Sequence, residues 1–178
     1  LFVAGNVLAR SELPSLLWKM GMMAVKNHTI PASEEWNLLV VNRWNEIPED
    51  YSVTLTELGN GQKVDSRIYP DLQEMFDAMR AEEIYPIVRE AYRTAEEQQE
   101  ILDERIQRYV NEGYSRSKAV RMAEEWVAVP GTSEHQIGIA VDINADKTKS
   151  TNDEVYAWLA ENAHNYGFIL RYPQGKED

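Results

Sequence analysis

The sequence predicts an α+β fold in which helices pack against a small antiparallel sheet. Short β-rich runs alternate irregularly with amphipathic helical segments, which favours this class over a regular α/β fold. The pair Asn60-Gly61 lies between two β-rich runs, 53–58 and 63–68, and supplies the positive φ angles that a tight hairpin requires. These runs are therefore expected to form a two-stranded antiparallel ribbon.

The segment before this ribbon is predicted to contain an arm and one strand. Residues 1–31 mix short apolar clusters with Pro14, Gly21 and Pro31, so we expect an irregular N-terminal arm with a helical piece near 13–25. The run 36–42, Trp-Asn-Leu-Leu-Val-Val-Asn, is rich in β-forming residues and predicts the first strand of the domain that follows. That domain is expected to span residues 32–178.

Three segments in the middle of the chain have clear periodic or capping signals. Leu72, Met75, Phe76 and Met79 form one apolar stripe, which predicts a helix over 71–82. The run 85–88 predicts a strand. Thr94 and the glutamate three residues after it form a capping-box pattern, which predicts a long helix ending near residue 113.

The remaining elements are predicted from caps and apolar runs. Ser115 or Ser117 begins a helix that continues to residue 125, and a strand is expected over 137–143. Either Ser150 or Thr151 caps a helix that ends at Gly167. Residues 168–170 then return to strand.

Composition restricts the classes of function. The chain of 178 residues has a formal net charge of −12, which repels phosphate backbones and argues against a nucleic-acid partner. It contains no cysteine, which excludes thiolate catalysis and cysteine-ligated zinc. No apolar run approaches 18 residues, so a membrane association would depend on an anchor upstream of Leu1, which is not an initiator methionine.

His135 and Asp142 are the candidate metal ligands. Imidazole nitrogen and carboxylate oxygen both bind zinc, and a catalytic site needs three protein ligands and an open position for water. The spacing suits a histidine just before a strand and an aspartate on it, with Gly138 and Ala140 on the aspartate's face and apolar residues on the other. Such a pair is common, so it does not by itself specify a metal site.

The sequence 133–142, Ser-Glu-His-Gln-Ile-Gly-Ile-Ala-Val-Asp, resembles the Ser-x-His-x-x-Gly-x-Ala-x-Asp signature of zinc D,D- and L,D-carboxypeptidases, the group that includes the VanY-type enzymes. Two further segments agree in order and distance. Residues 85–99 resemble the family's strand-to-helix turn, and residues 165–177 resemble the stretch before its last catalytic motif. The resemblance covers residues 36–178 and implies the VanY/hedgehog-like zinc D,D-peptidase fold.

The resemblance implies a Zn²⁺ cofactor bound by His135 and Asp142. It also implies that Arg93 is catalytic and contacts substrate, neutralising either the developing oxyanion or the substrate carboxylate. Gln98 and Ser133 inherit substrate-binding roles. The family commonly has glycine where this chain has alanine at position 91, a change that leaves Arg93 in place.

One motif of the family is not found in this sequence. Members of the family continue into a Glu-x-x-His element that supplies the general base and the third zinc ligand, and the sequence ends at Asp178 before such an element. We therefore expect the carboxypeptidase domain to be truncated at its C-terminus. His164 is a poor substitute ligand, because a histidine near a helix C-terminus is favoured there by the helix dipole alone.

The resemblance implies a hydrolase that removes the C-terminal D-alanine from peptidoglycan stem peptides or their precursors. D,D-carboxypeptidase activity is favoured, with a role in vancomycin resistance as one consequence. The alternatives are an L,D-carboxypeptidase, a related endopeptidase, or a catalytically incomplete module that binds muropeptides. The protein is expected to be a monomer that faces the cell wall outside the cytoplasm, anchored to the membrane only through a removed N-terminal segment.

Overall fold

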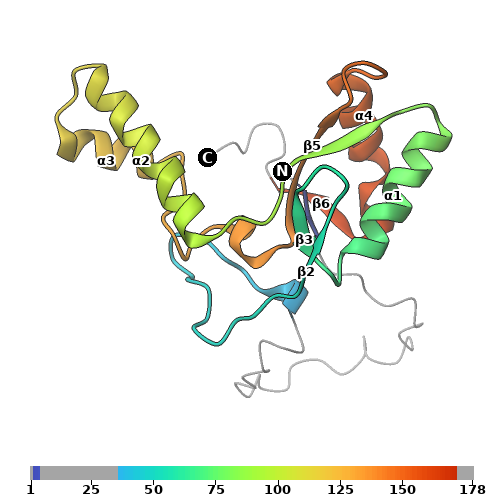
Figure 1. Ribbon diagram of the computed structural model, residues 1–178, viewed down its shortest axis with the longest axis horizontal. Coiled ribbons are helices and arrows are strands. Elements are labelled where there is room, and N and C mark those ends of the chain that lie inside the picture. The colour runs from blue at the N-terminus through green and yellow to red at the C-terminus, as the bar shows by residue number, and fades with distance from the viewer. Residues whose placement is uncertain (1, 5–35, 172–178) are drawn as a thin grey trace, which may run out of the picture.

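The computed structural model describes residues 2–4 and 36–171 (Figure 1). Strands β1 (Phe2–Ala4), β4 (Pro86–Glu90), β5 (Ala140–Ala145) and β6 (Phe168–Leu170) form an antiparallel sheet in the order β4-β5-β1-β6. A separate hairpin pairs β2 (Leu55–Glu57) with β3 (Lys63–Asp65). This arrangement confirms the predicted α+β class. Within these residues, no helix combines the length and the apolar character that crossing a bilayer requires.

Two helices supply one side of the main core. Helices α1 (Tyr69–Ala81) and α4 (Asn152–Asn162) lie beside the sheet in Figure 1 and bury their apolar stripes in a shared cluster with strand residues. The stripe predicted for α1 is buried as expected, and Trp158 is a core aromatic of α4, only 6% exposed. Burial of these side chains, at about 1.5–3 kcal/mol each, stabilises the body of the fold.

Helices α2 (Ala95–Asn111) and α3 (Arg116–Glu124) pack on each other and project away from the sheet (Figure 1). Their contact is a second apolar cluster that consists of Leu102, Ile106, Ala119, Ala123 and Val127. The predicted capping box is present, because the Thr94 hydroxyl accepts from the amide of Glu97 and the glutamate side chain accepts in return. Ser115, not Ser117, is the N-cap of α3.

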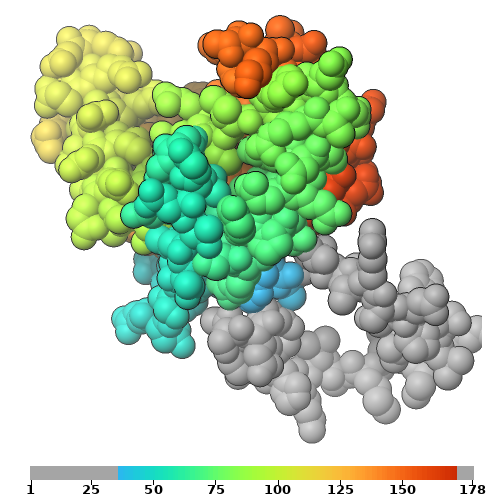
Figure 2. Space-filling view, turned by 45° about the vertical axis from the view of Figure 1, so that its right-hand side comes forward, coloured from blue at the N-terminus to red at the C-terminus, as the bar shows by residue number. Residues whose placement is uncertain are grey.

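The β2–β3 hairpin is present as predicted and has a three-residue loop, but the positive φ angle expected at Asn60 is not found. The Gly61 amide donates to the Leu58 carbonyl at 2.9 Å, and the Leu58 amide donates to Gln62 at 2.7 Å. Only Gly61 in this loop has a positive φ, +84°, and Asn60 does not. The Asn-Gly pair therefore predicted the hairpin correctly but the conformation of Asn60 wrongly, because a single left-handed glycine suffices in a three-residue loop. Figure 2 shows the hairpin, in teal, between α2 and α1.

The strand predicted over 36–42 is wrong. Residues Trp36–Leu38 form a 3-10 helix, η2, and a tight turn follows in which Asn42 bridges Asn45. The Asn42 side-chain oxygen accepts from the amides of Trp44 at 2.9 Å and Asn45 at 3.1 Å. Asparagine side chains compete with sheet pairing in this way, which explains the turn.

The irregular arm predicted for residues 1–31 is also wrong where the structure describes it. Residues 2–4 form β1, which lies between β5 and β6 in the sheet and pairs antiparallel with both. The helical piece predicted near 13–25 lies outside the described residues. A three-residue strand has too little sequence for a period of two to be recognised, and only its partners identify it.

The strand predicted over 137–143 begins later, at Ala140. Residues Glu134–Ile137 form a 3-10 helix, η3, and Gly138 ends it in the left-handed conformation at φ +77°. The predicted alternation therefore does not extend back to Gly138, although Ile137 and Ile139 are buried as expected. Close approach at Gly138 is to the hairpin, since an added Cβ would lie 3.2 Å from the amide nitrogen of Asp65.

The start of the last helix agrees with the prediction, but α4 ends at Asn162 instead of continuing to Gly167. Thr151 is the N-cap of α4 and forms a capping box with Glu154. The Ser150 hydroxyl instead accepts from the amide of Tyr85 at 2.9 Å, which joins the start of α4 to the start of β4. A short 3-10 helix, η4 (Ala163–Tyr166), ends at left-handed Gly167, and β6 follows.

Candidate active site

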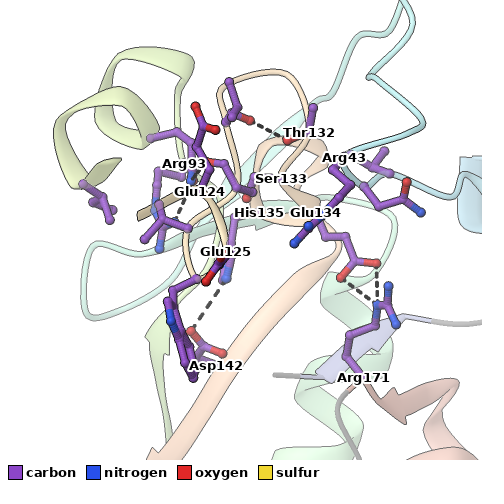
Figure 3. Close-up of a pocket in the computed structure, with 18 residues that line it drawn as sticks. Arg43, Arg93, Glu124, Glu125, Thr132, Ser133, Glu134, His135, Asp142 and Arg171 are labelled. Atoms are coloured by element: carbon purple, nitrogen blue, oxygen red, sulfur yellow. Dashed lines mark hydrogen bonds and ion pairs between the residues drawn. The ribbon is translucent and has the colours of Figure 1, made fainter. Parts of the chain in front are cut away.

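A pocket of about 680 Å³ opens between the sheet, the α2–α3 pair and the turn around residue 42 (Figure 3). Its wall contains every site residue that the sequence predicted: Arg93, Gln98, Ser133, His135 and Asp142. These residues come from four parts of the chain, namely the exit of β4, the first turn of α2, the η3 region and β5. The fold thus brings the predicted residues to one surface.

His135 is oriented by its backbone contact. Its Nδ1 lies 2.7 Å from the carbonyl oxygen of Ala91. A carbonyl only accepts hydrogen bonds, so Nδ1 carries the proton and Nε2 presents a lone pair. Metal-binding histidines use the same arrangement, in which the second ring nitrogen donates to a carbonyl or carboxylate.

Asp142 faces the lone pair of His135 (Figure 3). Its Oδ2 is 3.7 Å from Nε2 of the histidine. In a tetrahedral site with bonds of about 2.1 Å, two ligand atoms lie about 3.4 Å apart. The two side chains therefore fit a shared zinc ion. Among residues 2–4 and 36–171, no third metal-binding side chain joins the pair to make a cluster. His164 is exposed in η4 and does not line the pocket.

Burial keeps His135 in its metal-binding form. Desolvation lowers the pKa of the imidazole below its usual value, and the positive charge of Arg93 acts in the same direction. Asp142 and the carbonyl of Ala91 oppose this shift without reversing it. A neutral imidazole at neutral pH is the species that binds a metal ion.

Arg93 is held by two side chains and lies directly beside the histidine. Its guanidinium donates to the Gln98 side-chain oxygen at 2.8 Å and pairs with Glu90 at 3.3 Å. Its backbone amide donates to the carbonyl of His135 at 3.2 Å. Gln98 is 1% exposed, and its amide nitrogen donates to the carbonyl of Ala128 at 2.6 Å. Gln98 therefore orients Arg93 in this structure.

Ser133 is the residue before η3 and is 5% exposed at the pocket wall. The turn that precedes it is stabilised by Gln136, whose side-chain oxygen accepts from the Gly131 amide at 2.8 Å. Gly131 has a φ of +87°, which glycine adopts without strain. The serine is thus placed on an ordered turn next to His135.

The corner between η3 and β5 is supported by Tyr51 and by the β2–β3 hairpin. The Tyr51 hydroxyl donates to the carbonyl of Ile137 at 2.7 Å, and the amide of Asp65 donates to the carbonyl of Gly138 at 2.8 Å. Asp65 is fully buried and forms an ion pair with Arg67. Desolvation, and then the charge of Asp65, raise the pKa of Tyr51, so its hydroxyl remains a donor.

The sequence reasoning missed three pocket features. Glu134 accepts from Nε of Arg171 at 2.8 and 3.0 Å, which joins η3 to the end of β6 (Figure 3). Arg43 lines the opposite wall, and Trp126, 69% exposed, lies at the rim. Glu134 and Arg171 both lie in segments that resemble the family, which was a usable signal, whereas Arg43 lies outside the resembling motifs.

The chain is similar to known proteins both in sequence and in structure. The family model for VanY, described as D-alanyl-D-alanine carboxypeptidase, matches residues 61–178. A D-alanyl-D-alanine carboxypeptidase of Enterococcus faecalis (strain ATCC 700802 / V583) is 56% identical over 145 residues, which is 82% of this chain and 54% of the relative. The chain spans about half the length of the curated relatives that it matches.

Two solved structures are similar to this one. VanYB in complex with D-alanine-D-alanine is 57% identical with a TM-score of 0.74, and the match covers 78% of this chain and 77% of that chain. A VanY mutant from a VanB-type vancomycin resistance cassette, solved in complex with Zn(II), is also 57% identical with a TM-score of 0.74. That match covers 80% of each chain.

Proposed function

Because the chain belongs to the VanY family of D-alanyl-D-alanine carboxypeptidases, we propose that it removes the C-terminal D-alanine from peptidoglycan stem peptides. The observation that carries this proposal is the 3.7 Å separation of His135 Nε2 and Asp142 Oδ2 in a pocket shared with Arg93. The identity to a D-alanyl-D-alanine carboxypeptidase and the likeness to a zinc complex support it. We propose a carboxypeptidase domain over residues 32–178, to whose sheet residues 2–4 contribute the strand β1.

The predicted site residues each have a specific role in the proposed reaction. His135 and Asp142 would hold the zinc ion, which when bound lowers the pKa of its water toward about 7 and polarises the scissile carbonyl. The Ala91 carbonyl fixes the imidazole so that Nε2 points to the metal position. Arg93 neutralises either the developing oxyanion or the substrate carboxylate, and Ser133 hydrogen-bonds the substrate peptide. Gln98 keeps Arg93 in place.

The proposal also concerns the setting of the reaction. Stem peptides of the assembled cell wall lie outside the cytoplasm, so the protein is expected to act there. Attachment through a segment upstream of Leu1 and a monomeric state are further parts of this proposal. The acidic charge of −12 makes nucleic acid an unsuitable partner.

The direct test is release of D-alanine by the full-length protein. We expect release from a pentapeptide that ends in D-Ala-D-Ala, loss of this activity on chelation, and recovery when Zn²⁺ is added back. A tetrapeptide that ends in L-Lys-D-Ala is the matched substrate for an L,D-carboxypeptidase. Faster cleavage of the tetrapeptide would replace the D,D-assignment, and binding of either peptide without cleavage would support the muropeptide-binding module.

The variant Arg93→Lys is expected to lower kcat by about 100-fold, the effect of removing one oriented donor from the developing oxyanion. Lysine keeps the positive charge but loses the fork that contacts Gln98 and Glu90 together. Steady-state kinetics on the pentapeptide measures the loss, and zinc content by mass spectrometry should match that of the wild type. Unchanged turnover would remove Arg93 from the reaction.

A further inference from the structure

Arg43 differs from the other arginines of the pocket in its partners. The guanidinium of Arg93 pairs with Glu90 at 3.3 Å, and that of Arg171 pairs with Glu134 at 2.8 Å. Within residues 36–171, no carboxylate forms an ion pair with Arg43. The Arg43 guanidinium carbon instead lies over the ring of the neighbouring Trp44, 5.4 Å from the ring centroid. With respect to the part of the chain that the structure describes, the Arg43 guanidinium therefore keeps donors that a ligand can use.

The turn that carries Arg43 is well ordered. Val41, 1% exposed, anchors it in the core, and the Asn42 side-chain oxygen accepts from the amides of Trp44 and Asn45. Asn42 and Asn45 also exchange backbone hydrogen bonds at 2.9 Å in both directions. An arginine on such a turn loses less entropy on binding than one on a free loop, since its backbone is already fixed.

This turn is linked to the segment that bears the predicted catalytic residues. The amide of Ile47 donates to the carbonyl of Gly131 at 2.8 Å, two residues before Ser133. Figure 3 shows Arg43 on the side of the pocket opposite Arg93, with Ser133 and His135 between them in this view. Arg43, Arg93 and Ser133 line the same pocket, so both arginines border the space in which a peptide end would lie.

We propose that Arg43 binds the C-terminal carboxylate of the peptide substrate, which leaves Arg93 for the carbonyl oxygen of the scissile bond. The inference rests on the proposed carboxypeptidase function. Arg93 and His135 line the same pocket, and the backbone amide of Arg93 donates to the carbonyl of His135, so Arg93 lies on the histidine's side of that pocket. A carboxylate that leaves water needs a cation and fitted donors, and a guanidinium fork supplies both.

The test compares two substrates that differ only at the carboxylate: a peptide ending in D-Ala-D-Ala and the same peptide with a C-terminal amide. We expect Arg43→Gln to lower kcat/KM for the free acid by about 10- to 100-fold, mainly through KM, because a hydrogen-bonded charge is lost. The same variant should change cleavage of the amide by less than about 3-fold. The wild-type preference for the free acid should disappear accordingly.

Two further variants separate this role from a structural one. Arg43→Lys keeps the charge and should restore part of the activity on the free acid. Arg108→Gln, which alters an exposed α2 arginine outside the pocket lining, should behave as wild type on both peptides. The melting temperature and zinc content of Arg43→Gln should equal those of the wild type.

The outcomes distinguish this inference from the proposed function. An equal loss on the acid and the amide, or no loss on either, would overturn the assignment of Arg43 while leaving the carboxypeptidase function intact. If the wild-type protein cleaves neither peptide, the proposed function fails, and calorimetry then tests Arg43 separately. In that case a free-acid preference in binding that Arg43→Gln abolishes would support the inference, and its persistence would refute it.

Discussion

The variant His135→Ala is expected to lose bound zinc and to reduce D-alanine release by well over 100-fold. Removal of a residue that only hydrogen-bonds a metal ligand costs about 10- to 100-fold in metal affinity or activity, and loss of the ligand itself should cost more. The imidazole contributes Nε2 at 3.7 Å from Asp142, and alanine leaves the carboxylate without that partner. Metal content measured by mass spectrometry on full-length protein, together with the release assay, tests both parts.

A matched control comes from another histidine of the chain. His164 is exposed in η4 and does not line the pocket, so His164→Ala should keep wild-type zinc content and activity. The opposite result, in which His164→Ala loses zinc and His135→Ala retains it, would exclude His135 as a ligand. It would also revive His164 as the substitute ligand considered from the sequence.

The variant Gly138→Ala is expected to destabilise the protein by about 2–5 kcal/mol. A left-handed conformation costs a residue with a Cβ about 1–2 kcal/mol, and crowding in a packed site adds about 1–3 kcal/mol. The new Cβ would lie 3.1 Å from the side chain of Val53 and 3.2 Å from the backbone nitrogen of Asp65. For a chain of this length, the melting temperature should fall by on the order of 10 °C. Zinc affinity should fall as well, because η3 carries His135.

The control for this variant is Gly61→Ala in the hairpin loop. Gly61 has a similar φ, +84°, but an added Cβ meets nothing within 4 Å. Gly61→Ala should therefore lower the free energy of unfolding only by the cost of the left-handed conformation, about 1–2 kcal/mol, and should keep wild-type zinc affinity. Equal melting temperatures for the two variants would mean that contact with Asp65 and Val53 contributes nothing at Gly138.

Local patterns were enough to predict the helices and the hairpin. The stripe from Leu72 to Met79 and the capping box of Thr94 involve residues no more than a few positions apart, so the sequence contains the whole interaction. The same holds for Gly61, whose left-handed conformation needs only the absence of a Cβ. The backbone conformation of Asn60 was mispredicted, because the turn type depends on the register of both strands.

The sequence motif identified His135 and Asp142 as candidate metal ligands, but it did not predict the geometry of their side chains. The sequence placed His135 just before a strand and Asp142 on it, and the strand in fact begins at Ala140 after a 3-10 helix. The orientation of the imidazole depends on the carbonyl of Ala91, 44 residues away. A contact between residues so far apart in the sequence produces no local hydrophobic periodicity from which it could be predicted.

The sequence by itself determined the fold class, the main helices and the set of candidate ligands, because these follow from short-range periodicity, capping and a motif of ten residues. Only the tertiary structure decided that residues 2–4 complete the sheet, that Asn42 turns the chain, and that Arg43 enters the pocket. These features depend on contacts between distant segments, whose formation is governed by the packing of the whole chain rather than by the propensity of any one part.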